Sequence, residues 1–114
     1  MATLIAQQII QAGLKPTTVI PTVGGDKLAN TGIQFFHVIN SGIVAMTASV
    51  IPIVTTVIDP LFGALTKENA ILSLEASEEG YLGPFEVGAF NDVNGDITII
   101  CSVQTNIKLS ALYI

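Results

Sequence analysis

The feature that most constrains the fold is a long uncharged segment in the middle of the chain. From Leu28 to Ile58 the sequence contains no Asp, Glu, Lys or Arg, and the part from Gly42 to Ile58 is strongly apolar. A segment of this kind either crosses a membrane as a helix or forms strands whose apolar faces need a cover. The choice between these two structures decides the fold class.

The side-chain types in this segment favour strands. Gly42 to Ile58 has 17 residues, and 11 of them are β-branched, whereas a spanning helix needs about 20 mostly apolar residues. β-branched side chains lose χ1 freedom in helices and pack well on a pleated sheet. The flanks also lack the Lys and Arg excess that orients a span, since Asp59 follows directly. We therefore expect strands, and no membrane partner.

Alternation within the segment indicates how these strands are buried. One face would carry the apolar side chains of Val44, Met46, Ala48 and Val50. Pro52 cannot donate to a central ladder, so the sequence predicts either an edge strand or two strands joined by a bend. The apolar face would then be covered by a second sheet of the same domain or by a partner subunit.

Strand and turn patterns recur along the rest of the chain. Further strands are predicted at Thr18–Val23, Ile33–Asn40, Ala70–Ala76, Ile97–Val103 and the C-terminus, and loops at Gly24–Gly32 and Asp59–Asn69. Gly83–Phe90 is expected to form a turn followed by a short strand, and Asn94-Gly95 is a hairpin signal.

The N-terminal segment is the one place where a helix is predicted. Thr3 to Ala12 has apolar residues at helical spacing with Thr3 as a cap, although a docking arm fits equally well. The predicted fold class is all-β: an antiparallel β-sandwich or small barrel of about seven strands. Residues 1–16 would form the N-terminal helix or arm, and 17–114 the β-sandwich domain.

Composition restricts the partners. The chain has 114 residues, net charge −5, 50% apolar residues and only 11% charged residues, against roughly 25% charged in typical soluble domains. Its four basic residues are all lysines, so the basic stripes that bind nucleic acid are missing. The high apolar content favours contact with another protein chain, and the N-terminus lacks a secretory signal pattern. We expect a protein that remains where it is made until it is assembled.

No group of residues has the pattern of a catalytic, cofactor or metal site. Asp92, Asn94 and Asp96 alternate like calcium ligands, but the glycine and glutamate spacing of an EF-hand is absent, and a hairpin tip explains them. His37 is the only histidine and Cys101 the only cysteine, so there is no second histidine or cysteine to complete a metal site with either of them. GGDK at 24–27 lacks the spacing of a phosphate-binding loop. We expect no enzymatic activity and no cofactor.

The order of several short motifs resembles a group of small tailed-phage virion proteins. The motifs are GGDK at Gly24 to Lys27, N-x-G at Asn40 and Gly42, GPF at Gly83 to Phe85, and FND at Phe90 to Asp92 followed by NGDITI. Proteins of this group are similar to capsid decoration or cement proteins, which are all-β modules on an icosahedral shell, commonly as trimers. The long apolar stretch and the acidic SEEG at 77–80 depart from that pattern and leave open which face would dock.

The resemblance implies a function and a partner. We expect a non-enzymatic capsid decoration or cement protein that binds the major capsid protein, forms a homotrimer and resides on the virion surface after assembly in the bacterial cytoplasm. A head-tail connector or tail component is the first alternative. A soluble carbohydrate- or receptor-binding β-sandwich is the second, disfavoured because only Tyr81 and Tyr113 could stack on a sugar and there is no Trp. Candidate interface residues are Ile5, Ile9, Ile51, Ile53 and Val54.

Overall fold

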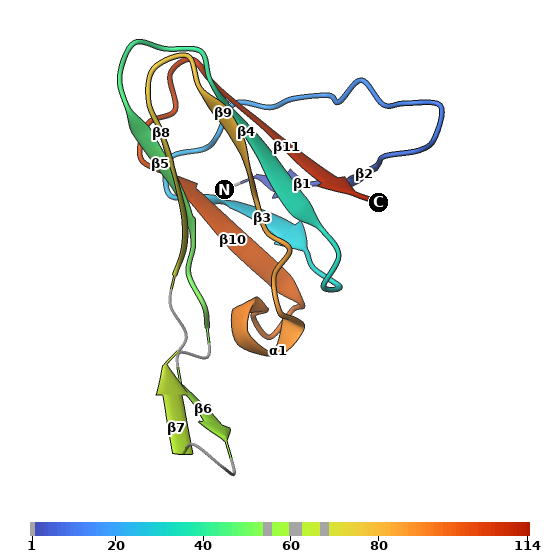
Figure 1. Ribbon diagram of the computed structural model, residues 1–114, viewed down its shortest axis with the longest axis vertical. Helices are drawn as coiled ribbons and strands as arrows, with labels where there is room; N and C mark the ends of the chain where they lie inside the picture. The colour runs from blue at the N-terminus through green and yellow to red at the C-terminus, as the bar shows by residue number, and fades with distance from the viewer. Residues whose placement is uncertain (1, 54–55, 60–62, 67–68) are drawn as a thin grey trace.

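Two β-sheets packed face to face form the body of the protein (Figure 1). The computed structural model describes residues 2–53, 56–59, 63–66 and 69–114. The strands in these ranges are β1 (Thr3–Leu4), β2 (Gln7–Gln8), β3 (Asp26–Ala29), β4 (Phe35–Asn40), β5 (Met46–Val50), β6 (Thr56–Asp59), β7 (Gly63–Thr66), β8 (Ala70–Leu74), β9 (Glu79–Leu82), β10 (Asp96–Cys101) and β11 (Ile107–Tyr113). The helix α1 (Val87–Phe90) is a single turn. The predicted all-β sandwich is confirmed, and the described ranges contain eleven strands where about seven were predicted.

The two sheets differ in size and share one core. The larger sheet has the strand order β1-β3-β10-β5-β8 and the smaller one β2-β11-β4-β9, while β6 and β7 pair only with each other. All pairs of strands are antiparallel except β1 with β3 and β2 with β11. Side chains of alternating residues fill the space between the sheets; Phe36, Val38, Ala48, Val50, Ile97, Ile99 and Leu109 have no exposed surface. This is the period-two burial expected for strands with one covered face.

The predicted N-terminal helix is wrong, and the extended arm is what the structure shows. β1 adds to the larger sheet beside β3, and β2 adds to the smaller sheet beside β11. Leu4 enters the core, whereas Ile5 is 84% exposed. The edges of β3 and β11 supply hydrogen-bond partners for the backbone of the arm. A helix of this length would be only marginally stable in water, so it does not compete with this pairing.

The long apolar run forms two strands, β5 and β6, as the bend interpretation predicts. The edge-strand interpretation is wrong, because β5 lies between β10 and β8. Met46, Ala48 and Val50 are buried as expected, while Val44 is 60% exposed because it precedes the strand.

The strands from β5 to β8, in the middle of the chain, form a long β-ribbon. β5 pairs with β8 up to Val50 and Ala70, and β6 pairs with β7 from Thr56 and Thr66 onward. Five residues separate the two paired stretches on one strand and three on the other. We call β6 and β7 the ribbon tip; it extends away from the sandwich at the lower end in Figure 1. The predicted loop at 59–69 thus contains β7.

Four other predictions fail, because local composition does not encode which segments find pairing partners. The predicted loop Gly24–Gly32 contains β3, and the predicted strand Thr18–Val23 has only one bridge, from Val19 to Leu109. Gly83–Phe90 ends in α1 rather than a strand. A turn does form at Asn94-Gly95, but α1 precedes it, so the predicted hairpin is absent. The strands predicted at Ile33–Asn40, Ala70–Ala76, Ile97–Val103 and the C-terminus are confirmed.

Candidate interaction surfaces

The candidate interface residues fall in two separate places. Ile5, 84% exposed, and Ile9, half-buried, belong to the N-terminal arm. Ile51 and Ile53 are 46% and 60% exposed and follow β5 at the base of the ribbon. Val54 lies outside the described residues. The chain therefore presents two candidate surfaces and not one.

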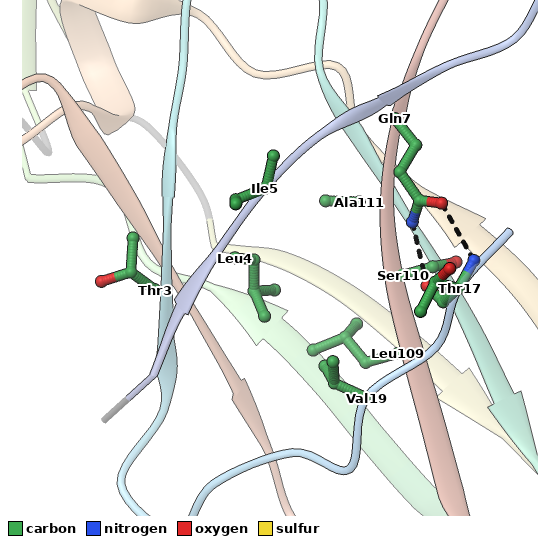
Figure 2. Close-up of a pocket in the computed structure, with 9 residues that line it drawn as sticks. All are labelled: Thr3, Leu4, Ile5, Gln7, Thr17, Val19, Leu109, Ser110 and Ala111. Carbon is green, nitrogen blue, oxygen red and sulfur yellow. Dashed lines mark hydrogen bonds between the residues drawn. The ribbon is translucent and has the colours of Figure 1, made fainter.

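The arm borders an apolar groove beside β11. Figure 2 shows Leu4 of the arm pointing toward Leu109 of β11, with Val19 beside Leu109; Ile5 and Ala111 also line the groove. The groove has a volume of about 370 Å³ and is open to solvent on one side.

The arm is held at both of its ends. At the start, the backbone N–H of Lys27 donates to the carbonyl of Ala2 over 2.9 Å, and the Ala2 N–H donates to the carboxylate of Asp26 over 3.3 Å. Further along, the side-chain amide of Gln7 both donates to and accepts from the backbone of Thr17, at 2.9 Å each (Figure 2). The arm is thus fixed by polar contacts, while its exposed isoleucine makes none of them.

The base of the ribbon carries a second apolar surface. Ile100, Ser49 and Ile71 lie directly opposite one another on β10, β5 and β8, on the side of the larger sheet that faces away from the core. Ile71 is 59% exposed, and Ile51 follows Ser49 by two residues. Residues 46–53, 70–74 and 97–102 contain no charged side chain. We call Ile51, Ile53, Ile71 and Ile100 the ribbon-base patch.

The neighbourhood of the only histidine does not form an activated nucleophile. His37 stacks on Tyr81 with ring centroids 4.6 Å apart, and its Nε2 lies 3.4 Å from a carboxylate oxygen of Glu79. Ser110 is directly opposite His37 on β11, but its Oγ is buried and has no hydrogen-bond partner among the described residues. A serine nucleophile needs both a bonded base and access to substrate. This serine has neither.

The acidic turn before β10 is organised by its own backbone. The backbone N–H groups of Asp96 and Asn94 donate to Oδ1 of Asp92 over 3.1 and 2.8 Å, and Lys27 lies 3.5 Å from Oδ2. The hydrogen bond from Asp96, together with that from Asn94 and the charge of Lys27, lowers the pKa of Asp92 below its usual value. Within the described ranges no three His, Cys, Asp or Glu side chains gather as metal ligands.

Cys101 is a core residue whose chemistry is suppressed by burial. The side chain is 4% exposed, and its removal from water, reinforced by the negative charge of Asp26, raises the pKa of the thiol to about 11. The thiolate is the reactive form of cysteine. We expect the folded chain to react with 5,5′-dithiobis(2-nitrobenzoate) at pH 8 at least ~100-fold more slowly than the chain unfolded in guanidinium chloride. Equal rates in the two states would show that Cys101 is accessible.

Comparisons with known proteins add no identification. No protein-family model matches the chain, and no curated protein or solved structure is significantly similar to it. Among the residues that the structure describes, none belongs to a helix with the length and hydrophobicity of a membrane span. Function must therefore be inferred from the surfaces themselves.

Proposed function

We propose that this chain is a non-enzymatic virion structural protein that decorates or cements a phage capsid. The observation that carries the proposal is the ribbon-base patch, an uncharged and apolar sheet surface next to a β-ribbon whose tip pairs with neither sheet. A two-stranded sheet is at best marginally stable alone in water, and exposed apolar patches mark interaction sites. The motif resemblance supplies the class of partner, an assembled capsid shell.

The physical requirements of a shell cement fit these features. Such a protein stabilises a shell by burying apolar surface and forming hydrogen bonds across neighbouring subunits. Binding only the assembled shell shifts the equilibrium toward it by mass action. The ribbon tip offers unpaired strand edges, and the patch and the arm groove offer apolar area. The homotrimer belongs to the same proposal and rests on the resemblance.

The experiment that tests this function is a copy-number measurement. Quantitative mass spectrometry of purified particles should give about one copy for every one to three major capsid subunits, which is the ratio expected of a symmetric shell cement. A handful of copies per particle would instead support the head-tail connector or tail component. Absence from particles would overturn the virion proposal and favour the carbohydrate- or receptor-binding alternative.

Replacing Ile53 by Asp tests which surface docks on the shell. The side chain is 60% exposed, so the fold should tolerate the charge, whereas burial of an unpaired carboxylate in an interface is costly. We expect binding to heads stripped of this protein to weaken at least ~10-fold in co-sedimentation. Ile114→Asp, at an 82% exposed terminal position away from the patch, should bind normally. Normal binding by Ile53→Asp would remove the ribbon base from the interface.

A further inference from the structure

A third surface lies at the end of the sandwich opposite the ribbon tip. It is formed by the loops 41–45, 75–78 and 102–106, which join β4 to β5, β8 to β9 and β10 to β11. Figure 1 shows these three connections side by side at the upper end of the molecule. We call them the loop end. None of its residues was singled out as a binding residue by the sequence patterns.

Hydrogen bonds from one buried side chain hold two of these loops together. The amide nitrogen of Asn40, a residue only 1% exposed, donates to the carbonyls of Val44 and Glu75 over 2.9 and 3.1 Å. Its amide oxygen accepts from the N–H of Gly42 over 3.0 Å. The first and second loops are thereby fixed relative to each other.

The third loop is tied to the first in the same manner. The N–H of Ser41 donates to the carbonyl of Asn106 over 2.9 Å, and the N–H of Thr47, in the adjoining strand β5, donates to Oγ of Ser102 over 2.9 Å. Surfaces that are organised before binding lose little conformational entropy when a partner arrives. The loop end is therefore suited to binding, and it is not simply a set of connections.

The loop end combines one apolar hollow and one hollow of mixed polar and apolar lining with exposed carboxylates. One hollow of about 210 Å³ is bordered by Ile43, Val44 and Val103, and another of about 280 Å³ lies between 45–47, 73–75 and Ser102. Ile43 is 94% exposed beside the first hollow. Glu75 and Glu78 are exposed on the adjoining loop, and neither forms an ion pair within the described part of the chain.

We infer that the loop end binds a protein segment in which lysine or arginine alternates with large apolar side chains. The apolar side chains would occupy the hollows and contact Ile43, and the cations would pair with Glu75 and Glu78. Charge complementarity decides between the possible occupants. A second copy of this chain carries the same net charge of −5, and phosphate-bearing nucleic acids or lipid headgroups would be repelled by the same carboxylates.

This inference is independent of the proposed capsid function. The ribbon-base patch is uncharged, whereas the loop end carries Glu75 and Glu78 and lies at the end of the long axis opposite the ribbon tip (Figure 1). If the ribbon end faces a shell, the loop end faces away from it.

The test uses three short synthetic peptides and the full-length chain. ¹⁵N-labelled protein is titrated with acetyl-Lys-Leu-Lys-Leu-Lys-amide, with its acidic counterpart in which Glu replaces Lys, and with a polar one in which Ser replaces Leu. We expect saturable shifts of the amide signals of 41–45, 75–78 and 102–106 with the first peptide, weakening as salt rises. The acidic and polar peptides should bind at least about fivefold more weakly.

Matched variants separate binding from folding. Glu75→Gln/Glu78→Gln removes the charges but retains hydrogen-bond acceptors, and should weaken binding about fivefold or more; Asp96→Asn, at the other end, should have no effect. Ile43→Ser should also weaken binding, whereas Val93→Ser, at a 98% exposed position, should not. The inference is overturned by absent binding, by shifts confined to other residues, by equal affinity for the acidic peptide, or by peptide-free self-association that shifts the same amides.

Discussion

Replacing Asn40 by Asp is expected to destabilise the protein by about 3–5 kcal/mol. The two side chains are nearly isosteric, and the acceptor for the Gly42 N–H is kept. The donor to the carbonyls of Val44 and Glu75 is lost, and a carboxylate oxygen takes its place against two carbonyl oxygens at a site with 1% exposure. Urea unfolding monitored by circular dichroism measures the change.

Two further variants make this result interpretable. Asn40→Ala removes all three hydrogen bonds without adding charge, and should cost about 2–4 kcal/mol. Asn106→Asp adds the same charge to an exposed residue of the same loop end, at a positive φ of 62° that Asp tolerates, and should change stability by less than about 0.5 kcal/mol. If Asn40→Asp is as stable as Asn106→Asp, the side chain of Asn40 does not hold the loops together.

The behaviour of Asn40 illustrates what the motif residues do in this fold. Asp26 of the GGDK motif accepts hydrogen bonds from the N–H groups of Thr22 and Ala2. Asn91 of the FND motif donates to the carbonyls of Asn30 and Gly95. These side chains fix loops and strand ends. The motifs that carry the resemblance therefore help to specify the architecture and do not name a chemistry.

The strands with clear alternation could be predicted from the sequence because each carries its own burial pattern. In β5 the buried and exposed positions follow the predicted face, and β8 alternates in the same way, since one side of each strand faces the core. Local composition does not encode which distant strand offers a partner. β3 begins at Asp26 within a run of turn-forming residues, and only its pairing with β1 and β10 makes it a strand.

The candidate surfaces were accessible to sequence reasoning only in part. The absence of charge around Ile51 and Ile53 is visible in the sequence, and both side chains are exposed as an interface would require. Ile71 and Ile100 join them through cross-strand register, which one sequence cannot supply. The sequence patterns do not indicate the loop end, because its three loops are far apart in sequence and meet through the buried amide of Asn40 and the hydrogen bond from Ser41 to Asn106.

The same dependence on distant contacts makes Gly83 irreplaceable, and Gly83→Ala is the second large effect we expect. Gly83 has a φ of 114°, a conformation that residues with a Cβ rarely adopt. An added Cβ would lie 2.7 Å from the ring of Phe85 and 3.2 Å from the backbone Cα of Phe35. The Phe85 ring cannot move aside easily, because it packs against Phe36 and Phe90 at centroid distances of 5.9 and 5.4 Å.

We expect Gly83→Ala to cost at least about 3 kcal/mol, from backbone strain and overpacking together. Gly88→Ala is the matched control: it lies in α1, and an added Cβ there meets nothing within 4 Å. That variant should be neutral or more stable by about 0.5–1 kcal/mol, because alanine favours helix and restricts the unfolded chain. Thermal and urea unfolding of both variants measure these changes in the free energy of unfolding. Equal stability of the two would show that the tight packing around GPF does not constrain this position.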